Sequence, residues 1–435
     1  MQTFNKMKCS LTHIYTDKNK GDAAIIVSTI KLIKSVYKDA EINLFSTFGE
    51  NDRQFKREHE FVKQYANNIY PGLFYQPIPS INGIELSRVF SLLWIFFKFT
   101  LLLITKNITL LSLFFSKREI EGIKTFISSE IIISKGGSYI TTQNKSLRQT
   151  ISLISMLYPF FLSKRYKKKI IIFSQSIGPI TGAFNNFLTK IALRDIDGIY
   201  LRESLCYDDY KIVKEIAKNN KIKFVPDAAF ALNYDNSSSY DNLPVFSSER
   251  YNIGFTLVDH AFKYISNNHQ KEIKRSKYRT AIIELMEHIL VDEKAIIHIF
   301  PQVTSDNSHE GHNDIKFSIE IQKELSSEYK DRVKFYEKDF NPFELKKMYS
   351  KMDLFIGTRL HSTIFALSSN VPAINISYHG SKSQGIYNNI KGFKDFVIDI
   401  NSIDSMKLLN LYEAMKNKKE TLKSLLEVEN LKFEG

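Results

Sequence analysis

An arginine and a histidine flank one leucine in the segment GTRLHSTIFAL, residues 357–367. Side chains two positions apart point in different directions on a helix, so Arg359 and His361 can serve one site only where the chain turns. We therefore predict that MDLFIG is a buried strand, that Thr358 caps a helix extending to Ser369, and that AINIS is the next strand. Near the free N–H groups at the start of this helix, the two cations favour an anionic ligand.

A third cation follows the next predicted strand. Lys382 lies in the segment ISYHGSKSQG, so Arg359, His361 and Lys382 come after consecutive strands and are expected to converge on one small anion. A guanidinium binds carboxylate or phosphate through two parallel hydrogen bonds, whereas a lysine acts as a point charge. The set favours a ligand that carries a phosphate beside a carboxylate. In the structural alternative, Arg359 pairs with an acid of the chain and His361 only caps its helix.

Polar residues also stand at the carboxyl ends of the other predicted strands, where ligands of open α/β sheets bind. The further candidates are Asp22, Gly136, Gly137, Gln175, Ser176, Arg202 and Asp227 in the N-terminal half, and Gln302, Ser362 and Tyr378 in the C-terminal half. Asp22 can cap its helix instead of bonding a hydroxyl. Arg202 can bind a substrate carboxylate or pair with Glu203, and Asp227 can simply brace a turn.

The segment HIFPQVTSDNSHEGHND contains side chains of metal-ligand type, namely His298, Asp306, His309, His312 and Asp314. Its two closest histidines are three residues apart in a polar loop, which is not the i, i+4 helical spacing of a zinc-protease site. The sequence also lacks a GxGxxG motif and a glycine-rich phosphate loop with Lys-Ser or Lys-Thr. We expect no metal, no dinucleotide and no other cofactor.

The composition is that of a globular protein with a basic surface. A length of 435 residues predicts two or three domains, and the formal net charge of +13 predicts attraction to polyanions. The densest basic run, SKRYKKK at 163–169, has no nucleic-acid-binding signature beside it, so nucleic acid is not an expected partner. Two distant cysteines and an N-terminus without a signal-peptide core indicate a cytoplasmic location.

Strand-like runs alternate with amphipathic helical stretches, and runs rich in Ile, Val and Phe are typical of parallel sheets covered on both faces. The first set is CSLTHIY, EINLFST, EIIISKG, KIIIFSQS, DGIYLR and KIKFVPD; the second is YNIGFTLV, KAIIHIFP, RVKFYE, MDLFIG, AINIS and FVIDI. A polar link at 233–250 separates them. We predict an α/β architecture of two doubly wound domains facing a cleft, 1–240 and 241–400, followed by helices over 401–435.

The segment VFSLLWIFFKFTLLLITKNITLLSLFF, residues 89–115, is unusually apolar and lies within a predicted helical insertion at about 85–118. Lys98 and Lys106 interrupt it, so it lacks the run of about 20 apolar residues that a membrane-spanning helix needs. Two interpretations stay open. The helices pack within the domain, or they contact a membrane peripherally while both lysines reach the lipid headgroups.

Seven motifs, in this order and at these distances, resemble the polysaccharide pyruvyl transferase family: NKGDAAI, SKGG, FSQSIGP, LRES, VPDAAF, GTRLHSTIFAL and PAINISYHGSKSQG. The resemblance spans roughly residues 8–400, and RLHS and QSIGP are its most specific elements. It implies two Rossmann-like domains of the GT-B kind and an enzyme that uses phosphoenolpyruvate to place a pyruvate ketal on a sugar of a surface polysaccharide. The chain departs from the family in its apolar 89–115 segment and at Gly136-Gly137-Ser138, where a third glycine is common.

The resemblance assigns contacts with the donor to four residues: Arg202, Arg359, His361 and Lys382. It implies that the C-terminal domain binds phosphoenolpyruvate and that the N-terminal domain receives the acceptor. We expect His361 to protonate the methylene carbon, because a histidine side chain can exchange protons near neutral pH. Arg359 and Lys382 would stabilise the departing phosphate. Asp22 or Asp227 is the candidate base.

The expected acceptor is a sugar or a lipid-linked oligosaccharide, with capsule, teichoic polymer and exopolysaccharide all open as the product. Location at the inner membrane face follows if 89–115 contacts lipid. Two other functions stay open. A GT-B glycosyltransferase would need a slot for the nucleobase and an acidic residue for the ribose of its nucleotide sugar. A non-catalytic protein would bind acidic glycans or membranes through its +13 charge and its apolar segment.

Overall fold

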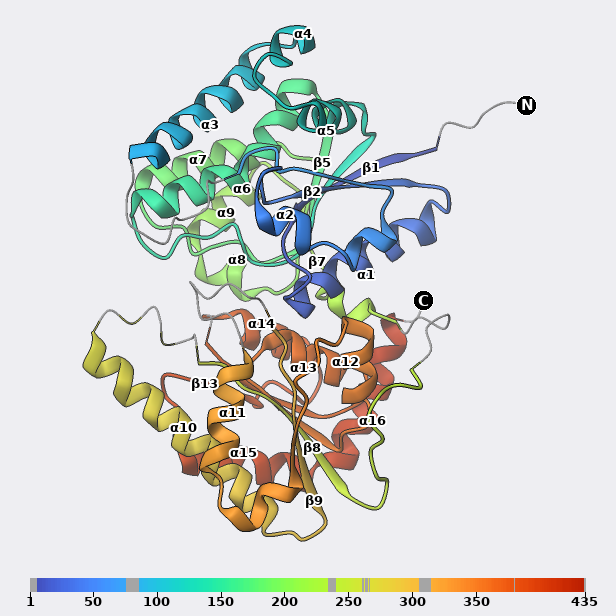
Figure 1. The fold of residues 1–435 in the computed structure, drawn as a ribbon, viewed down its shortest axis with the longest axis vertical. Coiled ribbons are helices and arrows are strands. Elements are labelled where there is room, and N and C mark those ends of the chain that lie inside the picture. Colours follow the sequence, from blue (N-terminus) through green and yellow to red (C-terminus); the bar gives the residue numbers. More distant parts are fainter. Residues whose placement is uncertain are drawn as a thin grey trace. The chain divides into compact units, whose positions relative to one another are not determined.

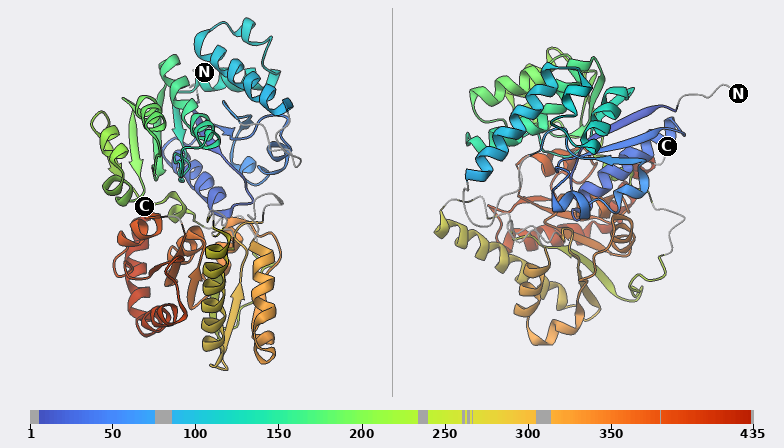
Figure 2. Two further views of the ribbon diagram at one scale, coloured as in Figure 1. Left: turned by 90° about the vertical axis from the view of Figure 1, so that its left-hand side faces the viewer. Right: turned by 45° about the horizontal axis from the view of Figure 1, so that its top comes forward.

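The computed structural model describes residues 6–75, 86–233, 240–259, 262, 265, 267–304, 314–378 and 380–433. The chain forms two compact units. Unit 1 comprises Met1–Asp17 and Asp22–Ala228, and unit 2 comprises Lys18–Gly21 and Ala229–Gly435. Each unit contains one parallel sheet with helices on both faces, which confirms the predicted α/β class (Figure 1, Figure 2).

The sheet of unit 1 has seven parallel strands in the order β3-β2-β1-β4-β5-β6-β7. They are β1 (Lys8–Ile14), β2 (Glu41–Ser46), β3 (Asn68–Tyr70), β4 (Ile131–Ser134), β5 (Lys169–Gln175), β6 (Gly198–Leu201) and β7 (Ile222–Phe224). The direction in which strands are added reverses between β1 and β4. A Rossmann-type switch point therefore lies at the carboxyl ends of these two strands.

The helices of unit 1 cover its sheet and build a mainly aliphatic core that also contains aromatic side chains. They are α1 (Lys20–Val36, whose first two residues belong to unit 2), α2 (Arg53–Arg57), α3 (Leu86–Ile104), α4 (Ile108–Leu111), α5 (Lys117–Ser128), α6 (Leu147–Tyr166), α7 (Ala183–Leu193), α8 (Leu205–Asp209) and α9 (Lys211–Ala217). Phe45, Phe99 and Phe126 are buried within this core. The Tyr158 hydroxyl donates to the carbonyl oxygen of Phe99 at 2.7 Å, which ties α6 to α3.

The sheet of unit 2 has six parallel strands in the order β10-β9-β8-β11-β12-β13. They are β8 (Tyr251–Thr256), β9 (Ala295–Ile299), β10 (Val333–Phe335), β11 (Leu354–Gly357), β12 (Ala373–Ser377) and β13 (Val397–Asp399). This is the same Rossmann-type order, with its switch point between β8 and β11. Strands buried on both faces require apolar residues throughout, which is why the sequence shows continuous runs here.

The helices of unit 2 are α10 (Asn268–Leu290), α11 (Asp314–Glu324), α12 (Pro342–Tyr349), α13 (Leu360–Leu367), α14 (Lys382–Asn388), α15 (Ser405–Asn417) and α16 (Lys419–Asn430). Short 3-10 turns lie at Val62–Tyr65, Ala228–Ala231, Ser327–Arg332 and Leu431–Phe433 of the chain. The helices expected after residue 401 are α15 and α16, and they group with unit 2. All twelve predicted strand runs contain a strand, whereas β3 was not predicted because its three residues show no periodicity.

Helix α13 differs in its bounds from the prediction. It begins at Leu360, and Arg359 occupies the N-cap position with extended backbone angles of φ −93° and ψ 119°. The expected cap, Thr358, is wrong, because its hydroxyl shares a 2.7 Å hydrogen bond with the buried Tyr278 hydroxyl. The helix ends at Leu367, before the predicted Ser369, and Asn370 closes the turn with a left-handed φ of 61°.

Lys98 is buried inside unit 1, so the interpretation that it reaches lipid headgroups is wrong. Its Nζ lies 2.7 and 2.8 Å from the two carboxylate oxygens of Glu119, and both residues are less than 10% exposed. The same carboxylate accepts hydrogen bonds from the Tyr75 hydroxyl and from the backbone N–H of Ser116, the N-cap of α5. This charged centre attaches the inner face of α3 to α5. Among the residues that the structure describes, none of the helices combines the length and the apolar character that crossing a membrane requires.

We predict that Lys98→Met destabilises the protein by about 3 kcal/mol, because it leaves the buried Glu119 carboxylate without its cation. The free energy of unfolding from urea titration measures this loss. The double variant Lys98→Met/Glu119→Gln removes the unpaired charge while Gln can still accept the Ser116 hydrogen bond, so it should regain most of the stability. A double variant no more stable than the single one would contradict the explanation.

Candidate functional site

The candidate site of unit 2 lies at the switch point of its sheet. Arg359 follows β11, and its neighbour Ser362 shares a 2.6 Å hydrogen bond with Thr256 at the end of β8. The Ser362 hydroxyl also donates to the carbonyl oxygen of Arg359 at 2.6 Å. Ser362 is fully buried, and its hydrogen bonds to Thr256 and Arg359 hold the ends of β8 and β11 together. Its predicted role in substrate binding stays a prediction.

Arg359 is held by an acid and a phenol. Its Nη2 and Nε lie 2.7 and 3.2 Å from the Oδ1 and Oδ2 atoms of Asp314, and its Nη1 donates to the Tyr378 hydroxyl at 3.0 Å. Arg359 is 8% exposed and Asp314 is 2% exposed. Burial lowers the pKa of Arg359, but Asp314 and Tyr378 raise it by more, so the guanidinium remains charged.

Asp314 also holds the loop that follows β9. Its Oδ2 accepts the backbone N–H groups of Gln302 at 3.1 Å and Val303 at 2.9 Å. The sequence suggested Asp314 only as one member of a metal-type cluster, and three other members of that cluster lie outside the described residues. Within the described part of the chain, no group of three or more His, Cys, Asp or Glu side chains could hold a metal ion.

Arg359 therefore pairs with an internal acid, as the structural alternative held. The pairing does not use all the hydrogen-bond donors of the guanidinium, because the contacts with Asp314 and Tyr378 involve three of its five N–H groups. The remaining two N–H groups have no hydrogen-bond partner among the residues that the structure describes. A charged side chain that is fixed in position and retains donors is suited to binding an anion.

His361 lies in the first turn of α13 and is partly exposed. A Cβ atom added to Gly21 would lie 2.3 Å from Cγ and Nδ1 of its imidazole ring, so Gly21 has to be glycine for the ring to take this position. Gly21 donates its N–H to the Asn19 side chain at 3.2 Å, which caps α1. The expectation that Asp22 caps this helix is wrong, because Asp22 lies within the first turn.

Lys382 and Gln302 complete the predicted set of unit 2. Lys382 is the first residue of α14, after β12, and its convergence with Arg359 stays a prediction. Gln302 is 1% exposed, and its Oε1 accepts a hydrogen bond from the Tyr349 hydroxyl at 2.9 Å. Its Nε2 has no hydrogen-bond partner among the described residues. Burying an N–H group without a hydrogen-bond partner costs free energy, unless a water molecule or a ligand accepts the hydrogen bond.

A lysine network that the sequence analysis missed lies beside these residues. Nζ of Lys18 and Nζ of Lys20 each lie 2.6 Å from the Asp339 carboxylate, after β10. Burial raises the pKa of Asp339, but the charges and hydrogen bonds of Lys20 and Lys18 lower it to about 2. The charged run TDKNKGD was the available signal, but nothing in it indicated which acid the lysines would meet.

In unit 1, a buried ion pair spans the switch point between β1 and β4. Lys135 Nζ lies 2.5 Å from Asp22 Oδ1 and donates to the carbonyl oxygen of Gly136 at 3.2 Å. The Lys135 side chain is 1% exposed, whereas that of Asp22 is 18% exposed. Lys135 was not predicted as a site residue, although it stands directly before the glycine pair that was. Its placement orients the Asp22 carboxylate at the carboxyl edge of the sheet.

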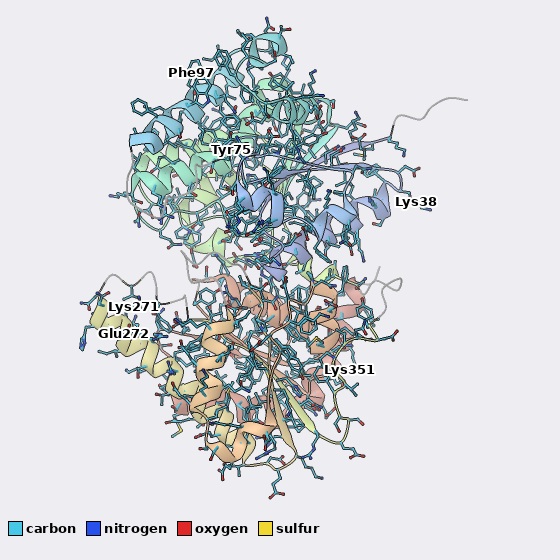
Figure 3. All side chains as sticks on the ribbon, in the orientation of Figure 1. Lys38, Tyr75, Phe97, Lys271, Glu272 and Lys351 are labelled. Carbon is cyan, nitrogen blue, oxygen red and sulfur yellow. The ribbon has the colours of Figure 1, made fainter. Side chains whose placement is uncertain are left out.

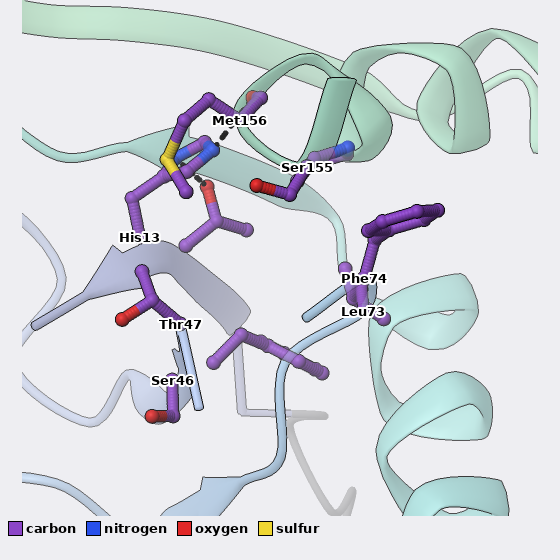
Figure 4. A pocket seen from close by; sticks show the side chains of 10 residues that line it. His13, Ser46, Thr47, Leu73, Phe74, Ser155 and Met156 are labelled. Atoms are coloured by element: carbon purple, nitrogen blue, oxygen red, sulfur yellow. Dashed lines mark hydrogen bonds between the residues drawn. The ribbon is translucent and has the colours of Figure 1, made fainter. Parts of the chain in front are cut away.

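A neutral histidine lies beside this pair. The ring of His13 stacks on Tyr139 with 4.5 Å between ring centroids, and its Nε2 lies 2.8 Å from the carbonyl oxygen of Met156. Burial, with a smaller contribution from the charge of Lys135, lowers the pKa of His13 to about 3, although the hydrogen bond to Met156 opposes this shift. Figure 4 shows His13 lining a small cavity with Ser46, Leu73 and other residues. The cavity measures about 10 Å³, the size of one water molecule.

Arg202 and Asp227 form a second buried pair of unit 1, after β6 and β7. Nη1 of Arg202 lies 2.6 Å from Asp227 Oδ2, and its Nε donates to the Ser176 hydroxyl at 2.9 Å. The alternative that Arg202 pairs with Glu203 is wrong, because the Glu203 carboxylate accepts the backbone N–H of Cys206. The pair brings together three predicted residues, namely Ser176, Arg202 and Asp227.

The glycine pair and Gln175 lie next to these residues. A Cβ on Gly136 would lie 2.6 Å from the carbonyl oxygen of Ser174, so the close approach of β4 and β5 requires glycine there. Gly137 adopts a φ of 139°, which glycine tolerates best. Gln175 is fully buried, and neither atom of its amide group has a partner in the described part of the chain. Its predicted binding role stays a prediction.

The two Rossmann-like units define the chain as an α/β protein of the GT-B fold class. Each unit has an ion pair at the switch point of its sheet. The sequence profile described as polysaccharide pyruvyl transferase matches residues 19–380, which is most of the chain. The chain therefore belongs to the polysaccharide pyruvyl transferase family. Among curated proteins it is similar to the amylovoran biosynthesis protein AmsJ of Erwinia amylovora, with 21% identity over 276 residues. The alignment covers 63% of this chain and 62% of AmsJ.

Solved structures with a similar fold include two epimerases. A putative UDP-N-acetylglucosamine 2-epimerase from Listeria monocytogenes has a TM-score of 0.53 and 10% identity, over 97% of this chain and 91% of that chain. The UDP-GlcNAc 2-epimerase from Neisseria meningitidis, bound to UDP-GlcNAc, has a TM-score of 0.53 and 9% identity, over 97% and 94% of the two chains. At such low identity the likeness establishes the fold alone.

We predict that acid destabilises the protein through its buried histidines. The pKa of His13 is lowered to about 3, and burial lowers those of His59 and His298 to about 4. Below about pH 6.5 these histidines take up protons in the unfolded chain but not in the folded chain, so the free energy of unfolding should fall as the pH is lowered from about 6.5 to 4. Each of the three histidines should contribute about 1.4 kcal/mol per pH unit to this fall. Urea titrations across this range measure the slope.

The matched variants for this prediction are His13→Gln and His269→Gln. His269 is an exposed histidine of α10, so its replacement should leave the slope unchanged. His13→Gln removes one of the groups that take up a proton only on unfolding, and the slope should decrease. Equal slopes for His13→Gln and the unmodified protein would show that His13 is not responsible.

Proposed function

We propose that this protein transfers pyruvate from phosphoenolpyruvate to a sugar of a cell-surface polysaccharide, or of its lipid-linked precursor, as a ketal. The observation that carries the proposal is the family match over residues 19–380, which includes the fixed guanidinium of Arg359 at the switch point of unit 2. The similarity to a protein named for amylovoran biosynthesis supports a polysaccharide as the product. Phosphoenolpyruvate acts as a co-substrate, and the proposal includes no cofactor.

Unit 2 is the proposed donor side. Phosphoenolpyruvate carries a phosphate and a carboxylate on adjacent atoms of one small molecule, and such an anion calls for several fixed donors. The two remaining N–H groups of Arg359, the N–H groups at the start of α13 and the charge of Lys382 supply them. Because Asp314 and Tyr378 already fix the guanidinium, the anion binds without paying the cost of ordering this side chain.

The proposed chemistry has two steps. In the first, His361 donates a proton to the methylene carbon, which becomes a methyl group, while one sugar hydroxyl adds to C2 of the donor and loses its proton. In the second, the other hydroxyl attacks C2, the C–O bond to phosphate breaks, and the ketal closes. The second proton leaves with the phosphate, so the products are the ketal and inorganic phosphate. Arg359 and Lys382 stabilise the charge on the departing group.

Unit 1 is the proposed acceptor side, and its two acids differ in their suitability as a base. Asp227 is fully buried in its pair with Arg202. The Asp22 side chain is 18% exposed, and the buried Lys135 holds it at the carboxyl edge of the sheet. A base must reach a hydroxyl proton within hydrogen-bond distance. Asp22 is therefore the better candidate for the base, and Asp227 serves to orient Arg202.

The test is acceptor-dependent release of phosphate from phosphoenolpyruvate, with candidate polysaccharides and lipid-linked oligosaccharides as acceptors and mass spectrometry of the product. We predict that Arg359→Lys lowers kcat/KM by at least about 100-fold, because lysine keeps the charge but not the forked geometry. Lys351→Ala is the matched control. Lys351 is exposed and precedes β11, so it lies at the amino edge of the same sheet, and its loss should leave kcat/KM unchanged (Figure 3).

Two results would count against the proposal. One is turnover of a nucleotide sugar with no turnover of phosphoenolpyruvate, which would favour a glycosyltransferase. The other is equal activity of Arg359→Lys and Lys351→Ala. Thermal unfolding must accompany both measurements, because a weakened pair with Asp314 destabilises unit 2. The variant Asp314→Asn separates the loss of stability from the loss of catalysis. It weakens the same ion pair but keeps the arginine, so it should retain more activity than Arg359→Lys at a similar melting temperature.

We predict that His361→Gln lowers kcat by about 100-fold or more and changes KM for phosphoenolpyruvate little, since proton donation acts on the chemical step. The pH profile of kcat should also lose the limb that His361 contributes. Stopped steady-state assays over the pH range in which the protein is folded measure both effects. A fall in kcat/KM through KM alone, with the pH profile unchanged, would assign His361 to binding instead of proton transfer.

A further inference from the structure

Helix α3 carries a second apolar face that the core of unit 1 does not cover. Its exposed side chains recur every three or four positions, which places them on one side of the helix. They are Val89, Phe90, Leu93, Trp94, Phe97 and Ile104, with exposed fractions between 46% and 68%. The opposite side carries the buried residues Ile95, Lys98, Phe99 and Leu102. We call the exposed set the outer face of α3.

The segment after α3 extends this outer face. Phe114 lies 5.6 Å from Phe97 and 6.0 Å from Trp94, measured between ring centroids, and Trp94 stacks on Phe97 at 5.7 Å. Leu113 beside them is 74% exposed. Figure 3 shows Phe97 on the outer side of unit 1, away from Tyr75. Clustered exposed apolar side chains of this kind mark a surface that meets an apolar partner.

The segment that carries the outer face is basic in sequence. Residues 86–118 include five lysines and arginines and no aspartate or glutamate, and one of the five, Lys98, is buried and paired with Glu119. Arg165 donates hydrogen bonds to the carbonyl oxygens of Leu103 and Ile104, and Lys106 lies 5.6 Å from the centre of the Tyr166 ring. These contacts place the basic run at 163–169 against the carboxyl end of α3. Lys164 and Lys167 of this run are exposed.

We propose that the outer face of α3 docks on the surface of a lipid bilayer that contains anionic phospholipids. An exposed aromatic stripe beside cations is the composition of helices that lie in the headgroup region. The absence of acidic residues from 86–118 fits a negatively charged surface, because each basic residue near such a surface adds to the attraction. The buried pair of Lys98 and Glu119 fixes the opposite side of α3, so the helix presents its outer face without leaving the fold.

This inference does not depend on the proposed transferase activity. It assigns Lys98 to the interior and gives the lipid contact to the aromatic side chains of α3 and to the exposed lysines after α6. A second copy of the chain and an apolar protein surface are the other possible occupants. They differ from a bilayer in a measurable way, since neither requires anionic lipid.

The test is flotation of the full chain with vesicles of phosphatidylcholine and phosphatidylglycerol in a three-to-one mixture, compared with phosphatidylcholine alone. Trp94 is the single tryptophan of the sequence and lies within the outer face, so its fluorescence reports on this surface alone. Binding to the mixed vesicles should shift its emission to shorter wavelength, and brominated lipid should quench it. Added salt should weaken the binding, because surface charge attraction is screened.

The matched variants each replace two exposed phenylalanines of unit 1. Phe90→Ser/Phe97→Ser changes the outer face and keeps Trp94, whereas Phe184→Ser/Phe187→Ser changes α7, where both side chains are about 60% exposed. The first should lower partition onto mixed vesicles by about tenfold or more, and the second should leave it unchanged. Lys164→Glu/Lys167→Glu should lower it as well, and only on anionic vesicles.

Three outcomes would overturn the proposal. The first is equal partition of the two phenylalanine variants onto mixed vesicles, and the second is binding of the full chain that is as strong without phosphatidylglycerol as with it. The third is a dimer, seen by light scattering, that Phe90→Ser/Phe97→Ser dissociates while no binding to vesicles occurs. Melting temperatures confirm that each variant is folded. Phosphate release with a soluble acceptor should be the same for both phenylalanine variants, so failure of membrane docking and failure of the proposed transferase activity give different results.

Discussion

The buried ion pair between Arg359 and Asp314 is the interaction on which the site of unit 2 depends. A guanidinium that is 8% exposed is tolerated only because a carboxylate offsets its loss of water. The same carboxylate accepts two backbone N–H groups after β9, so one acid fixes the ends of β9 and β11 together. A cation held in this way needs no rearrangement when an anion arrives, which is the condition for strong electrostatic stabilisation of a reacting group.

Unit 1 contains two further ion pairs of this kind, and their carboxylates differ in solvent exposure. The Asp227 carboxylate is completely enclosed by its pair with Arg202, which suits a structural brace. The Asp22 carboxylate remains partly exposed over a fully buried Lys135, which suits contact with a substrate. Beside them, burial keeps His13 neutral by lowering its pKa to about 3, so this histidine contributes shape and hydrogen bonds at neutral pH and no charge.

Helix α3 serves two environments at once. Its inner face is bound to α5 through Lys98 and Glu119, whose charges offset each other beside the rings of Tyr75, Phe99 and Phe115. Its outer face exposes apolar side chains beside cations, a combination that a water-facing helix would not need. Because the inner face already fixes the helix, the outer face is free to meet a partner. The one helix thereby connects the stability of unit 1 with its proposed place at a membrane surface.

The amino-acid sequence was enough to predict the class of fold and the strand ends where a site could form. Continuous apolar runs such as IIIS and LFIG are typical of strands covered on both faces, and motifs such as RLHS stand where such strands end. The pairing of the charged side chains, in contrast, became clear only from the folded chain. Asp314 lies 45 residues from Arg359, and Lys135 lies 113 residues from Asp22. Periodicity describes one element at a time, whereas these pairs form only when strand order brings separate loops to the same edge of a sheet.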